Sequence, residues 1–139
     1  MLTSVVAGLF DLLAPRTCPG CDLDLEPGCE SFCGACEVLL EVLAPVDGSG
    51  AAYVFGGPLA DAIRRLKYAG RTDISRALGT LLASACADLA GRVDAVIPIP
   101  LHPRRLRERG FNQASLLAVP VARRLGEPLL AGALRRSRD

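Results

Sequence analysis

The sequence predicts an α/β fold with a parallel sheet, preceded by a small N-terminal module rich in cysteine. Five of the six cysteines lie within residues 18–36, a segment too short to bury a stable core without a further constraint. The rest of the chain alternates between amphipathic helical patterns and short apolar runs, the order typical of a parallel sheet covered by helices. Half of the 139 residues are hydrophobic, so a sizeable core can form, built mainly from Leu, Ala and Val.

The N-terminal residues 2–13 are apolar, but no basic residue precedes them and Asp11 interrupts the run. The stretch therefore does not match a secretory signal, and it is too short to span a bilayer. We expect a short amphipathic helix that ends at Pro15. Without an export signal we expect a cytoplasmic protein with no membrane partner, and cysteines in a reducing cytosol bind metal more often than they form disulfides.

Four cysteines follow the spacing of a zinc ribbon. Cys18 and Cys21 form one CxxC pair, and after eleven residues Cys33 and Cys36 form a second. Two such turns present four thiolates to one ion, which suits tetrahedral zinc and leaves no open coordination position, so the zinc would be structural. A redox pair, an iron–sulfur cluster and cysteines without a ligand role are the alternatives. Cys29 could replace Cys33, but we favour it as a bystander.

This module is expected to occupy residues 1–43, and the Pro/Gly-rich segment 44–50 to separate it from a second domain at residues 51–139. A short strand is expected at residues 51–55. Gly57 and Pro58 then open a helix that Gly70 ends, since proline is favoured at the first helical position. The helix has the periodicity of one buried face, formed by Leu59, Ala62, Ile63 and Leu66.

A second amphipathic helix is expected to start at Thr72 or Asp73, either of which can cap it, and to close at Gly91. Its apolar stripe contains Cys86, which we interpret as a small buried hydrophobe and not as a ligand. Residues 93–97 form an apolar run typical of a strand buried on both faces. A weaker strand pattern occupies residues 129–134.

Between these two expected strands lie a loop and a third helix. Pro98, Pro100 and Pro103 are expected to hold the loop extended, and Asn112 to cap a helix that runs to Leu125. Pro120 should kink this helix or mark a second start.

The charge of the chain is unevenly distributed. The net charge of +1 divides into −5 up to Pro100 and +6 from Leu101 onward. Such asymmetry is typical of a protein whose basic second part faces a polyanion. The alternative is that ordinary basic and acidic surfaces happen to fall in different segments of the chain. Several of the arginines follow the expected strand at 93–97, where open α/β sheets bind ligands.

Arginine side chains at such a position can fork onto phosphate oxygens, glycine allows a close approach of the backbone, and a helix start offers N–H groups. A solvated arginine-rich loop is the alternative. The candidate phosphate-binding residues are Arg104, Arg105, Arg107, Arg109, Gly110, Asn112 and Gln113.

Four motifs together resemble the ComF family. They are the CxxC pairs, the segment Leu66–Tyr68 with Gly70, the segment Pro98–His102, and the run Arg109–Gln113. The resemblance implies a type I phosphoribosyltransferase-like domain, and some members are tied to DNA uptake in competence. It implies zinc ligands at Cys18, Cys21, Cys33 and Cys36. It also implies a loop at residues 104–113 that holds pyrophosphate or phosphate. The ligand would be phosphoribosyl diphosphate or pyrophosphate, with magnesium in a full-length member.

The sequence also departs from this family pattern. No two acidic residues are adjacent, whereas the family pattern has an acidic pair before a phosphate-binding loop. The chain therefore resembles a C-terminally truncated member with an incomplete sheet, which we expect to be inactive as a transferase by itself and prone to self-association. The alternative is a zinc-ribbon adaptor that binds nucleic acid or a DNA-uptake partner protein. Phe111 is the lone aromatic residue of the basic segment, which disfavours direct binding of a single strand.

Overall fold

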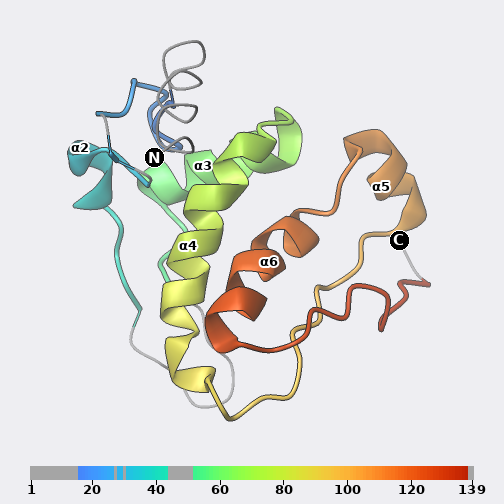
Figure 1. Ribbon diagram of the computed structural model, residues 1–139. Helices are drawn as coiled ribbons and strands as arrows, with labels where there is room; N and C mark the ends of the chain where they lie inside the picture. The colour runs from blue at the N-terminus through green and yellow to red at the C-terminus, as the bar shows by residue number, and fades with distance from the viewer. Residues whose placement is uncertain (1–15, 27, 30, 44–51, 138–139) are drawn as a thin grey trace, which may run out of the picture.

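The computed structural model describes residues 16–26, 28, 29, 31–43 and 52–137 (Figure 1). The expected N-terminal helix at residues 2–13 and the expected boundary at residues 44–50 lie outside these residues. The regular structure is helical, in the order α2 (Gly34–Glu37), α3 (Gly57–Tyr68), η1 (Thr72–Ile74), α4 (Ser75–Ala85), η2 (Ala87–Leu89), α5 (Pro103–Arg109) and α6 (Gln113–Leu125). None of the helices in the described part of the chain combines the length and apolar character needed to span a bilayer.

The predicted α/β fold with a parallel sheet is wrong for the described part of the chain, which contains no strand. Its β contacts are isolated bridges that pair Thr17 with Asp24, Val42 with Tyr53, and Val96 with Leu129. The segments 51–55, 93–97 and 129–134, which we expected to be strands, each take part in such a bridge through a single residue. The type I phosphoribosyltransferase-like sheet is therefore not observed.

The residues around the parallel bridge explain why the segment 93–97 does not extend into a strand. The N–H of Val96 donates to the carbonyl of Pro128, and the N–H of Leu130 donates to the carbonyl of Val96, both at 2.9 Å. Pro98 and Pro100 follow, and proline has no N–H with which to continue a ladder. Ile97 is 42% exposed, so the run is not covered on both faces as a central parallel strand must be.

Helix α3 confirms the amphipathic pattern expected after Gly57. Pro58 lies in its first turn, and Leu59, Ala62 and Leu66 are buried on one face. The helix ends at Tyr68, and Gly70 then takes a left-handed conformation with φ 67°, which favours glycine. Lys67 and Tyr68 therefore lie at the carboxyl end of α3, where the chain turns toward η1.

The second predicted helix forms, but it is divided into η1, α4 and η2. Neither Thr72 nor Asp73 caps α4 through its side chain. Instead the Ser75 hydroxyl donates to the carbonyl of Thr72 at 2.6 Å. Cys86 follows α4 and is partly buried against a small cluster of buried residues from α4 and α6, which fits its interpretation as an apolar residue.

Helix α6 confirms the cap predicted at Asn112, whose side-chain oxygen accepts from the N–H of Ala114 at 3.0 Å. Pro120 lies inside α6 without dividing it. Helices α4 and α6 run side by side (Figure 1), and Gly79 of α4 faces Pro120 so closely that a side chain at position 79 would collide with the proline ring. The missing N–H and ring of proline usually disrupt a helix, and here the glycine makes room for that ring.

One hydrophobic core joins the cysteine module to the helices. Phe32 and Cys18 are almost completely buried, at 1% and 0% exposure. The buried residues of this cluster come from both sides of residue 44, and they are Cys18, Phe32, Cys36, Leu59, Ala62, Leu66, Ile74 and Leu78. The module and helices α3 and α4 are therefore packed against one another through a shared core.

Candidate metal centre and arginine cleft

The four cysteines predicted as metal ligands lie together in the structure. Cys18 and Cys21 flank a tight turn, Cys33 precedes α2, and Cys36 lies within α2. Their four sulfur atoms are all within 4.8 Å of one another, and the sulfurs of Cys21 and Cys33 are 3.7 Å apart. Sulfurs around a tetrahedral zinc ion with bonds of about 2.3 Å are roughly 3.8 Å apart. The donor set and spacing therefore fit one tetrahedral metal ion.

Cys29 does not belong to this cluster. Its thiol donates to the carbonyl of Phe32 at 3.4 Å, and the group of four sulfurs forms without it. The interpretation of Cys29 as a bystander in metal binding is therefore consistent with the geometry.

Backbone N–H groups favour the thiolate form at one position of the cluster. Burial acts to raise the pKa of Cys18, but hydrogen bonds from the backbone of Cys33, Cys21 and Gly20 outweigh it and lower this pKa to about 7. The N–H of Cys33 lies 3.4 Å from the Cys18 sulfur. For Cys36, burial and the neighbouring thiols raise the pKa above its ordinary value. A bound cation reverses that tendency, because it stabilises every thiolate around it.

The turn between Cys18 and Cys21 packs directly against the start of α3. A Cβ atom at Gly20 would lie 2.6 Å from Cβ of Pro58 and 3.1 Å from the sulfur of Cys36. No ordinary side chain fits in that space, because real Cβ atoms do not approach other heavy atoms so closely. Glycine at position 20 is therefore required by the contact between the cysteine module and α3.

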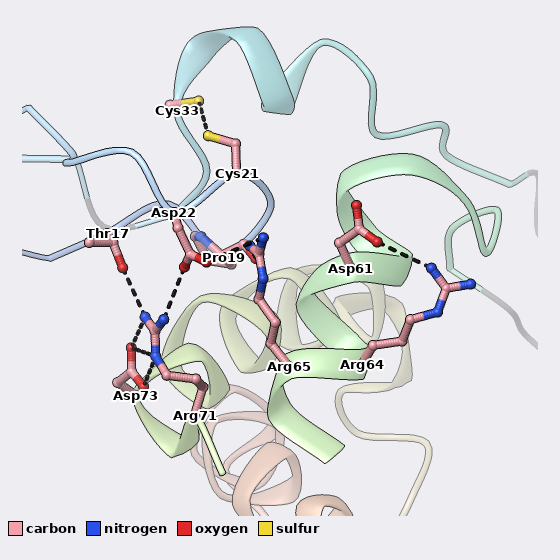
Figure 2. Close-up of polar contacts among 10 residues, drawn as sticks. All are labelled: Thr17, Pro19, Cys21, Asp22, Cys33, Asp61, Arg64, Arg65, Arg71 and Asp73. Atoms are coloured by element: carbon pink, nitrogen blue, oxygen red, sulfur yellow. Dashed lines mark hydrogen bonds and ion pairs between the residues drawn. The ribbon is translucent and has the colours of Figure 1, made fainter. Parts of the chain in front are cut away.

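Asp22, directly after Cys21, is bound by two arginines of the helical part (Figure 2). Arg71 donates to one carboxylate oxygen at 2.9 Å, and Arg65 lies 3.2 Å from the other. Arg65 also donates to the carbonyl of Pro19 at 2.8 Å. Asp22 has a φ of 61°, a left-handed conformation that aspartate tolerates better than most residues. We call Asp22, Arg65 and Arg71 the knuckle clamp.

Arg71 has further partners in this network, as Figure 2 shows. It donates to the hydroxyl of Thr17 at 2.8 Å and to the carboxylate of Asp73 at 2.8 Å. The hydrogen bonds from Arg71 lower the pKa of Asp73 below its ordinary value, although partial burial opposes this. Sequence reasoning did not identify the clamp, because nothing in the local pattern links residue 22 to residues 65 and 71.

The arginine-rich segment is a helix, which corrects the prediction of an extended loop. Pro103 occupies the first turn of α5, and the side chain of His102 accepts from the N–H of Arg104 at 3.3 Å. Arg104 and Arg105 pair with Glu108 at 3.0 and 3.2 Å. These are the (i, i+4) and (i, i+3) spacings that stabilise helices. Hydrogen bonding from Arg104 also lowers the pKa of Glu108 below its ordinary value.

The predicted phosphate-binding residues separate into two groups. Arg105, Arg109 and Gln113 line a cleft of about 380 Å³ beside the end of α3. Arg104 and Arg107 are exposed on α5 and are not part of that lining.

Gly110 and Asn112 have structural roles between α5 and α6. Gly110 ends α5 with φ 81°. Asn112 caps α6 and donates through its side-chain nitrogen to the carbonyl of Ile99 at 3.0 Å.

Arg109 is held in place within the cleft. Its guanidinium donates to the side-chain oxygen of Gln113 at 2.6 Å, and it lies 5.4 Å from the centre of the Tyr68 ring. Lys67 and Tyr68 of α3 also line the cleft, and the remaining lining residues are Leu101, His102 and Arg136. Sequence reasoning used Lys67 and Tyr68 for the family resemblance but did not identify them as site residues, since the turn that brings α3 to α5 cannot be derived from local periodicity.

The chain is similar to curated bacterial proteins named for DNA use and competence. It is 32% identical over 113 residues to DNA utilization protein YhgH of Escherichia coli strain K12. The aligned region covers 76% of this chain and 47% of the relative. It is 38% identical over 85 residues to competence protein F of Haemophilus influenzae, and this alignment covers 57% of this chain and 37% of the relative. It is 32% identical over 79 residues to competence protein ComFC of Bacillus subtilis, and this alignment covers 56% of this chain and 33% of the relative.

The chain therefore spans about half the length of the curated relatives that match over most of it. No family profile matches the chain, and no solved structure matches it.

Proposed function

Because this chain belongs to the ComF family of competence proteins, we propose that it is a phosphoribosyltransferase homologue that binds phosphate or pyrophosphate beside a structural zinc site. The observation that carries the binding role is the convergence of Arg105, Arg109 and Gln113 on one cleft. Arginine binds phosphate oxygens through paired N–H groups, and Arg109 is already oriented by Gln113 and Tyr68. A DNA-uptake process is the proposed setting, in keeping with the names of the relatives.

The zinc proposal rests on four convergent thiols with no other ligand type. Four thiolates fill the coordination of zinc, so that the ion would brace the turn at Cys18 and the start of α2 without taking part in chemistry. Because Cys18 and Cys36 also belong to the shared core, the ion would support the position of α3, and α3 carries one wall of the cleft.

The zinc proposal is tested by elemental analysis of purified protein, which should give one zinc per chain. Cys36→Ser should lose the metal. Cys29→Ser is the matched control, because it removes a thiol of the same module that lies outside the sulfur cluster, and it should retain full zinc occupancy. Full occupancy in a Cys33→Ser, Cys36→Ser double variant would show that the metal lies elsewhere.

The binding proposal is tested by calorimetric titration with pyrophosphate. Arg109→Gln should weaken binding about tenfold or more, since a charge-assisted hydrogen bond contributes on the order of 1.5–3 kcal/mol. Arg124→Gln removes the same charge near the carboxyl end of α6, outside the cleft lining, and should bind like the parent. Binding should weaken with added salt. Equal affinity in both variants would mean that the arginines are only solvated surface.

A further inference from the structure

A separate hollow lies at the seam between the cysteine module and the helices. Its volume is about 410 Å³, which falls in the range that binds small molecules. Its lining joins residues of the module, such as Thr17 and Ser31, to residues of η1 and α4, such as Asp73 and Arg76. It shares none of its lining residues with the cleft beside the end of α3. We call this hollow the seam pocket.

Arginine dominates the charge of the seam pocket. Arg16, Arg71 and Arg76 line it together with one carboxylate, that of Asp73. Arg71 donates to Asp73 and to the hydroxyl of Thr17, both at 2.8 Å (Figure 2). A guanidinium has five N–H donors, so an arginine that has a protein partner can still donate to a ligand. Because its lining holds more cations than anions, the pocket favours an anionic ligand.

The seam pocket also offers apolar surface. Ile74 and Ala77 line it and are only 2% and 5% exposed. Leu25 lines it from the module side and packs against the core that contains Ile74, and the buried Pro19 lies in the same lining. An aliphatic group placed against these residues would be removed from water, which contributes favourably to binding.

From this combination we propose that the seam pocket binds a carboxylate that is joined to a small aliphatic group. Arg16 and Arg76 bind the carboxylate, and the aliphatic group packs on Leu25 and Ile74. The carboxylate of Asp73 in the lining repels a second negative charge on a ligand, which favours a singly charged carboxylate over a phosphate. A free organic acid and the C-terminal residue of a polypeptide both offer this chemistry. The site is independent of the proposed phosphate-binding function.

The experiment follows the full zinc-loaded chain by heteronuclear NMR during titration with N-acetyl-leucine, and the signals of Ser31 and Ala77 should shift. Two analogues each remove one part of the ligand. N-acetyl-leucinamide lacks the negative charge, and it should bind about tenfold more weakly because the charge-assisted hydrogen bonds are lost. N-acetylglycine keeps the charge but lacks the aliphatic side chain, and it should bind about fivefold more weakly because less apolar surface is buried.

Variants then assign the binding to the seam pocket. Arg16→Gln and Arg76→Gln should each weaken the binding of N-acetyl-leucine about tenfold, since each removes a charged donor. Arg64→Gln is the matched control, because Arg64 is an exposed arginine of α3 that pairs with Asp61 and does not line the pocket. It should bind like the parent. Circular dichroism of each variant checks that the helices are intact.

Three results would overturn the proposal: N-acetyl-leucine does not bind, the acid and its amide bind alike, or Arg16→Gln and Arg76→Gln both bind like Arg64→Gln. Displacement of N-acetyl-leucine by pyrophosphate would overturn it as well, because the two ligands would then share a site. None of these results bears on the phosphate-binding proposal, which is tested with pyrophosphate alone.

A pentapeptide that ends in leucine with a free carboxyl group identifies the source of the ligand. If it binds more tightly than N-acetyl-leucine, the natural ligand is the C-terminus of a polypeptide, because further residues of the peptide then add contacts. If it binds no more tightly, the ligand is a free organic acid.

Discussion

Asp22 is held by arginines that lie far from it in the sequence, since Arg71 is 49 residues away. The carboxylate receives both Arg65 and Arg71 and is only 44% exposed, so its ion pairs are less screened than isolated surface pairs. We therefore expect Asp22→Asn to lower the free energy of unfolding by about 1 kcal/mol. Urea denaturation of the zinc-loaded protein measures this difference.

The control for that variant is Asp61→Asn. Asp61 pairs with Arg64 at 3.1 Å within α3, and both side chains are more than half exposed, at 53% and 61%. Such a pair contributes little to stability, so Asp61→Asn should unfold almost like the parent. Equal losses in the two variants would show that the knuckle clamp is no stronger than an ordinary surface pair.

At the scale of single residues, the sequence predicted those roles that depend on near neighbours. The grouping of the four cysteines follows from the CxxC spacing, and the cap at Asn112 follows from its position before an apolar run. Lys67, Tyr68, Asp22 and Arg71 were not assigned their roles, because their partners are brought close by turns whose direction has no local sequence signature.

Helices α4 and α6 meet where a glycine faces a proline. In most helix interiors Gly→Ala is favourable by up to about 1 kcal/mol. Gly79→Ala should instead destabilise the protein by about 1–3 kcal/mol, because the new methyl group would collide with the ring of Pro120. Thermal or urea denaturation would measure the change.

A Pro120→Ala background separates the helix propensity of alanine from its collision with the proline ring. With the ring removed, adding Gly79→Ala should become neutral or stabilising, because helix propensity alone then acts. A loss of the same size in both backgrounds would mean that the cost does not come from the contact between Gly79 and Pro120.

At the scale of elements, helices were predicted better than strands. Helices α3 and α6 are marked locally by Pro58, Asn112 and Gly126 and by a repeating apolar face. A strand depends instead on a neighbour, and the run at 93–97 pairs with Leu129 through Val96 alone. Helix α5 was missed because Pro103 was interpreted as extending a loop, although proline also fits the first turn of a helix.

The whole molecule should respond to metal removal as one unit. Since the core joins Cys18, Phe32 and Cys36 to α3 and α4, a strong chelator should lower the midpoint of thermal unfolding of the helices by on the order of 10 °C. Circular dichroism follows the helices, and a zinc-sensitive dye follows metal release. The two transitions should coincide in the zinc-loaded protein. A helical transition unaffected by chelation would mean that the module and helices unfold independently.

The overall arrangement was only partly accessible from the sequence. Separate domains at residues 1–43 and 51–139 were expected because the cysteines and the helical patterns are segregated along the chain. Burial of Phe32 against helices from the other side of that division depends on tertiary packing, which segregation in the sequence does not reveal. The cluster of four cysteine sulfurs involves only four residues within one short segment, and its formation was predicted from their spacing alone.

The knuckle clamp also has a consequence for synthesis of the protein on the ribosome. The chain emerges from its N-terminus, so Cys18, Cys21, Cys33 and Cys36 leave the exit tunnel before Arg65 and Arg71. During that interval the nascent module lacks both the clamp and the core residues of α3. Zinc supplied during translation would hold the turn in place until the helices arrive. A chelator present during cell-free synthesis should therefore reduce the soluble yield more than the same chelator added after release.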